Sequence, residues 1–282
     1  MVQHFVAPPQ WEWYIVWYFF LGGIAGGAYA LGAVLRVFGD HRDQPLARVA
    51  FLIALPALAI CPILLTLDLG RPLRFWHMLI DARTLLPILK YWSPMSVGAW
   101  VLLIFGVFAL ISFLEALGLT GRALNGGFGA LFTVVGAFFG LFLAGYTGVL
   151  LSVSNQPIWS DTWALGGLFL ASGLSVATAS LELFGRLGSA SAEAKLRRAD
   201  QFFIVLELLL LVLFFATIGA AGGRFLDPRW LGLWAVVLAG TVVPLAIRLA
   251  APARRPAALL ASVLVVLGGL ALRMVVVFGA QL

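Results

Sequence analysis

The sequence predicts an all-α polytopic membrane protein, and three observations carry that prediction. Hydrophobic residues make up 62% of the 282 residues and charged residues only 11%, whereas a soluble domain carries about 25% charge. The mean hydropathy is +1.05. The apolar residues gather in eight runs, each near the roughly 20 residues that an α-helix needs to cross a bilayer. Barrel strands would instead appear as short alternating segments.

The eight predicted spans form a single integral membrane domain over residues 1–282. They are residues 13–38, 48–67, 94–117, 127–153, 163–184, 201–222, 230–249 and 257–278. The first span carries two overlapping small-xxx-small pairs within residues 22–27, and the fourth carries another at Gly136 and Gly140. Such pairs let helices approach closely, so we expect the first and fourth spans to pack together. Residues 188–200, before the sixth span, are predicted to be a small solvated loop.

Basic residues in the loops set the expected orientation. The loops after the first, third, fifth and seventh spans hold eleven of the eighteen lysine and arginine residues, and the face that carries both termini holds six. Cytoplasmic loops carry the excess of Lys and Arg, so both termini are expected to be periplasmic. All ten tryptophans also fall near this outer face. A lopsided aromatic belt is one explanation, and a binding pocket with a docking surface is the other.

The composition also argues against several functions. The net charge of +6 is typical of loops attracted to anionic lipid rather than of nucleic-acid binding. The histidines, His4, His41 and His77, lie at or beyond the ends of the predicted spans, so a pair of histidines cannot ligate haem inside the membrane. Cys61 is the single cysteine and cannot hold an iron–sulfur cluster by itself. We expect no metal site, and electrons would have to pass through a bound organic cofactor.

Polar side chains gather where the second and third spans reach the outer face. The segments LDLGRPLRFWHML (residues 67–79) and SPMSVGAW (residues 93–100) place charge, proline and aromatic groups there. Asp68 is a candidate for the site, with a surface ion pair to Arg71 or Arg74 as the alternative. Polar groups at membrane depth are costly and mark functional sites. We therefore expect this region to bind a lipid-soluble molecule with a polar head.

Two tyrosines are the expected hydrogen-bond donors of that site. Tyr146 lies in the fourth span about seven residues, or ~10 Å, from the outer end, and Tyr18 lies at a similar depth in the first span. A phenol there can donate to a carbonyl that enters from the lipid. The alternative for each is a core tyrosine whose hydroxyl is bound by a neighbouring backbone carbonyl. Packing the first span on the fourth would bring both tyrosines to one wall of a pocket.

Four further charged residues lie within or beside the last four spans. Arg273 is expected to extend outward to the interface, to neutralise Asp68, or to hold a polar head group. Glu207 lies two helical turns after Asp200 and so on nearly the same helix face, and Glu182 lies near the inner end of the fifth span. The three carboxylates are a candidate proton route from the cytoplasm, with pairing to basic loop residues as the alternative.

The order of the motifs resembles a known family. The segments YFFLGGIAGGAYALGAVL (residues 18–35), LDLGRPLRFWHML, SPMSVGAW, YTGVLLSVSNQPIW (residues 146–159) and LRMVVVFGAQ (residues 272–281) are similar to the NrfD-like family, the membrane subunits of the polysulfide reductase type. The resemblance implies eight helices in two four-helix bundles, both termini periplasmic, and a quinone site near the outer face. Tyr146 stands at the family's quinone-site tyrosine and Asp68 at an acidic residue. Tyr18 departs from a quinone-site histidine, and tyrosine titrates far above pH 7.

The resemblance also implies partners. The family's membrane subunit lacks haem and iron–sulfur clusters and docks onto a four-cluster iron–sulfur protein, which contacts a catalytic subunit that is often a molybdenum enzyme. The sequence thus predicts a quinone-binding subunit (menaquinone or ubiquinone) of a respiratory oxidoreductase in the inner membrane of a bacterium or archaeon. Tyr18, Tyr146, Asp68, Arg71 and Arg273 would bind the quinone, and the first three would take part in its chemistry. The alternatives are a secondary transporter and a purely structural membrane anchor.

Overall fold

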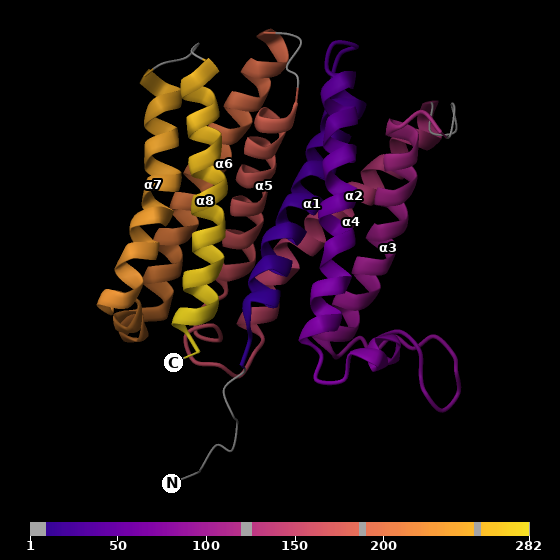
Figure 1. The fold of residues 1–282 in the computed structure, drawn as a ribbon, viewed down its shortest axis with the longest axis vertical. Helices are drawn as coiled ribbons and strands as arrows, with labels where there is room; N and C mark the ends of the chain where they lie inside the picture. Colours follow the sequence, from indigo (N-terminus) through magenta and orange to yellow (C-terminus); the bar gives the residue numbers. More distant parts are fainter. Residues whose placement is uncertain (1–9, 120–125, 186–189, 251–254, 282) are drawn as a thin grey trace.

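A computed structural model describes residues 10–119, 126–185, 190–250 and 255–281 (Figure 1). Within these residues, eight helices are long and apolar enough to cross a membrane, which confirms the predicted all-α polytopic fold. They are α1 (Trp13–Phe38), α2 (Gln44–Asp68), α3 (Pro94–Ala116), α4 (Gly126–Ser152), α5 (Ala164–Phe184), α6 (Ala190–Ile218), α7 (Pro228–Ala250) and α8 (Arg255–Gly279). Two 3₁₀ helices, η1 (Pro72–Met78) and η2 (Gly219–Leu226), follow α2 and α6.

Proline and glycine mark the ends of these helices. Pro94 begins α3 and Pro72 begins η1. Proline suits a first turn because the N–H that it lacks has no partner inside the helix. At Gly219 the backbone turns to a φ of +54°, a left-handed conformation that glycine adopts without steric cost, and α6 gives way to η2. The predicted sixth span, which continued to residue 222, therefore ends four residues too late.

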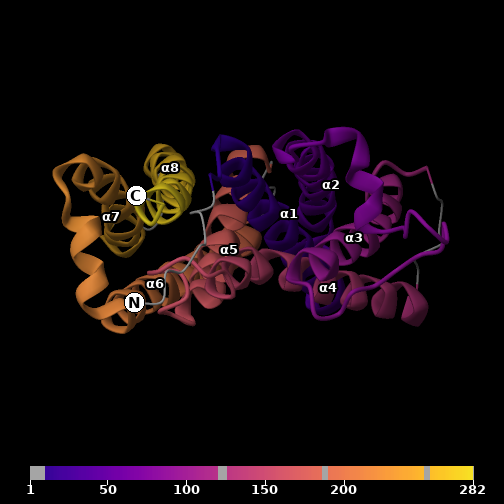
Figure 2. The ribbon, with the colours of Figure 1, turned by 90° about the horizontal axis from the view of Figure 1, so that it is seen from below.

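Helices α1 and α5 occupy the centre of the molecule. Figure 2 shows α2, α3 and α4 on one side of this pair and α6, α7 and α8 on the other. The most apolar windows of α1 and α5 are 83% and 78% buried, whereas those of α2, α3, α4, α6 and α7 are only 28–33% buried. Helix α1 packs against α2, α4, α5 and α8. Helix α1 therefore joins the two groups of helices, although the division into two four-helix bundles stays a prediction.

The close approach of α1 and α4 rests on glycine. A Cβ atom built on Gly26 would lie 2.1 Å from the carbonyl oxygen of Gly140, a distance that no side chain tolerates. The two helices therefore touch backbone to backbone, as the small-xxx-small pairs predicted. Farther along the same helix pair, a Cβ on Gly136 would collide with the Tyr29 ring.

The predicted loop over residues 188–200 is wrong for its described part, because α6 begins at Ala190. Ala192 and Leu196 are buried in an apolar cluster with residues of α1, α2 and α5. Lys195 Nζ lies 2.5 Å from the Asp43 carboxylate at the start of α2, and this hydrogen bond lowers the pKa of Asp43. The charged segment looked solvated in sequence, but it docks on the ends of its neighbours.

The first and last described segments meet at one face of the molecule. The Trp11 backbone N–H donates to Gln281 Oε1 at 2.6 Å, and Gln281 Nε2 donates to the Trp11 carbonyl at 3.1 Å. We call this end the terminal face, where α1, α3, α5 and α7 begin (the lower end in Figure 1). The other end is the opposite face. Which side of the membrane the terminal face occupies stays a prediction.

Candidate functional site

The two predicted tyrosines approach each other near the terminal face. Tyr18 lies in the second turn of α1 and Tyr146 in the last two turns of α4. They are 2% and 7% exposed, and the two phenols are close enough to interact electrostatically. The close packing of α1 on α4 brings them together, as the sequence predicted. Cys61 of α2 lies against Tyr18, with its Sγ 3.9 Å from the Tyr18 carbonyl oxygen.

The two hydroxyls have different surroundings. Tyr146 Oη donates to the carbonyl oxygen of Pro94 at 2.5 Å, which is the backbone-carbonyl alternative that the sequence left open. The Tyr146 oxygen can still accept a hydrogen bond through its lone pairs. For Tyr18, no hydrogen bond of the hydroxyl is found among the described residues, so its O–H remains available. The pair thus offers one donor and one acceptor to a bound molecule.

Helix α3 holds Tyr146 in position. A Cβ on Gly98 would lie 2.5 Å from Tyr146 Oη, so the phenol lies directly on the α3 backbone. The loop before α3 is tied down beside it, because Trp100 Nε1 donates to the Ile88 carbonyl at 3.0 Å and Ser96 Oγ accepts from the Lys90 N–H at 3.1 Å. The motif SPMSVGAW thereby supplies the fixed wall behind Tyr146.

Asp68 is half-buried at the end of α2 on the terminal face. Glu12 is close enough to act on its carboxyl group electrostatically. The alternative of a surface ion pair is not what the structure shows, because the ion pairs between described residues include neither Asp68 nor Arg71 nor Arg74. Arg71 is exposed in the adjoining loop. Asp68 thus keeps a carboxyl group free of ion pairs at the same end of the molecule as both tyrosines.

Arg273 is fully buried on α8 and does not extend to the interface. Its guanidinium donates to the carbonyl oxygens of Phe19 at 3.2 Å and Gly269 at 2.6 Å, and to Ser172 Oγ at 3.1 Å. Ser172 and Arg273 both lie close enough to Glu207 to act on its carboxyl group. The structure thus brings Arg273 together with Glu207 and the α1 backbone behind Tyr18, and no contact joins it to Asp68.

Glu182 and Asp200 meet at a second buried arginine toward the opposite face. Arg248 of α7 donates to both Glu182 oxygens at 2.9 Å, and its Nε lies 2.5 Å from Asp200 Oδ2. Ser262 Oγ donates to Glu182 at 2.5 Å, and Ser175 Oγ donates to Asp200 at 3.3 Å. The predicted proton-route carboxylates therefore face one another, with Asp200 close enough to Glu207 to interact with it.

Sequence reasoning missed Arg248, which it counted among the basic loop residues. Arg248 lies inside the predicted span, residues 230–249, and its side chain is only 2% exposed because it packs against Glu182 and Asp200. Ser172, Ser175 and Ser262 were missed as well, since single serines in apolar helices carry no distinctive signal. The three-residue spacing of Ser172 and Ser175, which places both on one face of α5, could have drawn attention to them.

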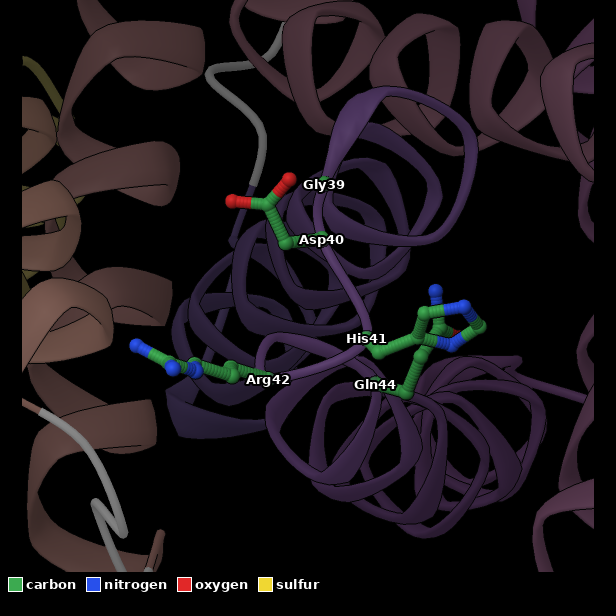
Figure 3. A pocket seen from close by; sticks show the side chains of 5 residues that line it. All are labelled: Gly39, Asp40, His41, Arg42 and Gln44. Atoms are coloured by element: carbon green, nitrogen blue, oxygen red, sulfur yellow. The ribbon is translucent and has the colours of Figure 1, made fainter.

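A pocket of about 510 Å³ lies at the opposite face, where α1 joins α2. Figure 3 shows the Asp40 and Arg42 side chains on one side of this loop and His41 on the other. The residues that line it are Gly39, Asp40, His41, Arg42 and Gln44. Most are exposed, and both tyrosines and Asp68 lie at the other end of the molecule. Across the described chain, no group of three or more His, Cys, Asp or Glu residues is placed to hold a metal ion.

Comparison with known proteins relates the whole chain to one family. The family described as "Polysulphide reductase, NrfD" matches residues 3–282. The chain is 28% identical to a polysulfide reductase subunit of Wolinella succinogenes over 236 residues, 76% of this chain and 71% of that protein. It is 26% identical to protein NrfD of Escherichia coli K12 over 316 aligned positions, 96% of this chain and 95% of that protein.

A shorter stretch resembles a third protein. Over 102 residues the chain is 26% identical to a selenate reductase subunit of Mesobacillus selenatarsenatis, which covers 36% of this chain and 22% of that protein. The names of the first and third proteins give polysulfide and selenate as the substances that their enzymes reduce. Two of the three named proteins are thus subunits of reductases.

Proposed function

Because the chain belongs to the polysulphide reductase NrfD family, we propose that it is the quinone-binding membrane subunit of a multi-subunit respiratory oxidoreductase. The observation that carries the proposal is the meeting of Tyr18 and Tyr146 near the terminal face, with the unpaired carboxyl group of Asp68 at the same end. A quinone when bound supplies two-electron, two-proton redox chemistry. The protein's part is to hold its oxygens and to move protons.

The residues present fit a quinone head group. A quinone carbonyl accepts a hydrogen bond, and the Tyr18 hydroxyl is available to donate one. A quinol hydroxyl donates, and the Tyr146 oxygen can accept it while its own O–H stays on the Pro94 carbonyl. Phe142 stacks on Tyr146 with ring centroids 6.1 Å apart and is itself 40% exposed, so the apolar side of the site faces the lipid from which a quinone arrives.

Asp68 is the proposed proton acceptor. Its carboxylate can take up a proton that leaves a quinol oxygen and release it to water at the terminal face. Arg71 lies three residues farther along, exposed in the loop, and supplies positive charge at the mouth of the site. Since the four guanidinium contacts of Arg273 are protein acceptors, we assign that residue to the wall behind Tyr18 rather than to direct quinone contact.

Electrons would leave through the terminal face to a partner with iron–sulfur clusters, which in turn contacts a catalytic subunit. The loop between α2 and α3 supports this proposal because it presents large apolar side chains to solvent: Leu73 is 90% exposed, Tyr91 79% and Trp92 67%. Such residues are favoured where proteins dock. The excess of basic residues at the other end supports a periplasmic terminal face.

Two other functions are less well supported. A secondary transporter often has helices broken near the midplane, but α7 runs unbroken from Pro228 to Ala250 through Pro244, and the named relatives include reductase subunits. A purely structural anchor needs no buried phenol with a free hydroxyl at membrane depth, where unsatisfied polar groups are costly.

Purification in mild detergent tests the proposal. The chain is expected to bring with it a partner with iron–sulfur absorbance, and lipid extraction is expected to yield about one quinone per complex. A partner without any quinone, in a complex that binds none on titration, would support the anchor. A lone chain that binds no quinone would favour the transporter.

A further inference from the structure

The pocket at the opposite face is formed by a short loop that is held firmly in place. Asp43 is fully buried beneath the loop, and its Oδ2 accepts from the Asp40 backbone N–H at 2.9 Å. The Asp43 N–H donates to the Asp40 carbonyl oxygen at 2.9 Å, and Lys195 of α6 lies 2.5 Å from the same Asp43 carboxylate. The pocket of about 510 Å³ is therefore preformed, and its volume is within the range of about 300–1,000 Å³ that is typical of small-molecule sites.

The pocket lies at the depth of lipid head groups. Helix α2 has 25 residues and is about 37 Å long at 1.5 Å per residue, whereas the hydrocarbon core of a bilayer is about 30 Å thick. The start of α2, which the pocket adjoins, therefore extends into the head-group layer. Phe38 precedes the pocket residue Gly39 and is 80% exposed. An exposed aromatic ring at this depth can contact the first carbons of an acyl chain.

The charges at the pocket balance one another. Asp40 and Arg42 line it, and Asp43 and Lys195 form the ion pair beneath it. Two carboxylates and two basic groups leave no net charge, so a purely anionic ligand would find no excess of positive charge here. A ligand that carries one charge of each sign matches the pocket better, because each of its charges can face an opposite one.

The two charged side chains of the lining are open to such a ligand. Lys195 lies 2.5 Å from Asp43 but 3.5 Å from Asp40, whose side chain is 81% exposed, so Asp40 can still accept hydrogen bonds. Arg42 is exposed, and its side chain forms no hydrogen bond or ion pair within the described chain. Figure 3 shows both side chains on the same side of the loop. A guanidinium binds phosphate through two parallel N–H donors, and a carboxylate accepts from an ammonium group.

We propose that this pocket binds the head group of a phospholipid that carries both a phosphate and a primary ammonium group, as phosphatidylethanolamine does. Arg42 binds the phosphate, Asp40 accepts from the ammonium group, and Phe38 contacts the upper part of an acyl chain. Phosphatidylcholine has no ammonium N–H to donate, and phosphatidylglycerol has no positive charge to place beside Asp40. The site lies at the other end of the molecule from both tyrosines, so it does not depend on the proposed function.

Native mass spectrometry of the delipidated protein in detergent, with whatever partners accompany it, tests the choice of lipid. One phosphatidylethanolamine is expected to bind at least about tenfold more tightly than phosphatidylcholine or phosphatidylglycerol, the equivalent of one charge-assisted hydrogen bond. Equal affinities for the three lipids, or tighter binding of phosphatidylglycerol, would overturn the proposal. Glycerophosphoethanolamine has the same head group without acyl chains. If it bound as tightly as the lipid, the ligand would be a soluble compound and the lipid site would be refuted.

Variants locate the site on the protein. Arg42→Gln is expected to weaken phosphatidylethanolamine binding about tenfold. Asp40→Asn is expected to remove the preference over phosphatidylcholine, and since Lys195 keeps its contact with Asp43, α6 stays docked. Arg48→Gln is the matched control, because Arg48 is an exposed arginine of the same helix outside the lining, and its loss should leave the affinity unchanged. Unchanged binding by Arg42→Gln, or an equal loss in Arg48→Gln, would show only a general attraction of basic residues to lipid and would contradict the site.

Discussion

Two residues of the candidate site are held in place by hydrogen bonds to backbone carbonyl oxygens. The Tyr146 hydroxyl is fixed on the Pro94 carbonyl, and the Arg273 guanidinium is fixed on carbonyls of α1, α5 and α8. Gly98 beside Tyr146 and Gly23 beside Arg273 have no side chain, so the phenol and the guanidinium can lie directly on the backbone. The residues that position the site are therefore as important as those expected to touch a quinone.

Gly98 provides a residue-scale test of this idea. In a Gly98→Ala variant the new Cβ would lie 2.5 Å from Tyr146 Oη, so the phenol must leave the α3 backbone. We expect quinol-linked turnover to fall about tenfold, which equals the loss of one hydrogen bond. The control is Gly106→Ala on the same helix, where no atom lies within 4 Å. Steady-state assays of both variants in assembled complexes make the comparison, and equal turnover would show that Tyr146 needs no fixed position.

At this scale the sequence singled out some residues of the candidate site and missed neighbouring ones. Tyr18, Tyr146 and Asp68 stood out because isolated polar groups in apolar helices are rare. Arg248 did not, because a basic residue two positions before the end of a predicted span is typical of the membrane boundary, and the sequence does not show that Glu182 and Asp200 enclose it. The partners of Arg273 also could not be predicted, since three of them are backbone carbonyls, which no residue type identifies.

Among the helices, α1 packs against helices of both groups, namely α2 and α4 on one side and α5 and α8 on the other. It meets α4 through Gly26 and Gly140, and α5 through Gly23 and Gly173. Because these glycines have no side chain, α1 packs closely on both helices. Tyr18 and Tyr146 meet on the α4 side of α1, and Arg273 binds the α1 backbone at Phe19. A small displacement of α1 would change both environments.

Replacing Gly26 by alanine tests the α1–α4 contact. The Cβ would lie 2.1 Å from the Gly140 carbonyl oxygen, so the helices must separate, and overpacking of this kind costs about 1–3 kcal/mol. We expect Gly26→Ala to lower the unfolding free energy by about 3 kcal/mol. Gly22→Ala is the control on the same helix, because its Cβ would only reach Thr147 at 3.8 Å. Denaturant titration in detergent measures both, and similar stabilities would contradict the close backbone contact.

The contact between the starts of α2 and α6 makes stability depend on pH. The hydrogen bond from Lys195 lowers the folded-state pKa of Asp43 from its usual 3.8, so the contribution is complete above that value and is lost as the pH falls through the lower folded-state pKa. Thermal unfolding of wild type and Asp43→Asn should differ near pH 7, and the difference should shrink as the pH falls well below 3.8. A difference that persists in acid would show that the carboxylate charge is not the cause.

The helices themselves were predictable because a membrane span is recognisable from its length and apolar composition. The first span was predicted at its observed limits, and most others ended within a few residues. The sixth was not, because the helical segment before it is charged and its helicity depends on Leu196 and Lys195 docking on other helices. Tertiary contacts decide such ends, and one sequence does not reveal them.

Considered as a whole, the molecule is asymmetric from one face to the other. The terminal face carries both tyrosines, Asp68 and the exposed aromatic loop, while the opposite face carries Arg248 with its two carboxylates and the ion pairs of Lys195. Trp11 stacks on Trp159 with ring centroids 5.1 Å apart, and Trp159 Nε1 donates to the Val276 carbonyl at 2.8 Å, so aromatic residues also pack between α1 and α8 at the terminal face. Because Trp159 is fully buried, part of the lopsided tryptophan distribution reflects packing inside this end of the molecule.

The central claim is that Tyr146 takes part in quinone chemistry, and quinol-linked turnover of a Tyr146→Phe variant tests it most directly. Loss of one hydrogen bond to a reacting oxygen predicts a decrease of about 10–100-fold, with partner assembly and activity toward artificial electron donors unchanged. Tyr29→Phe is the control, because Tyr29 is a buried tyrosine of α1 bound to Ser112, away from the site. Unchanged turnover of Tyr146→Phe in an intact complex would contradict the account.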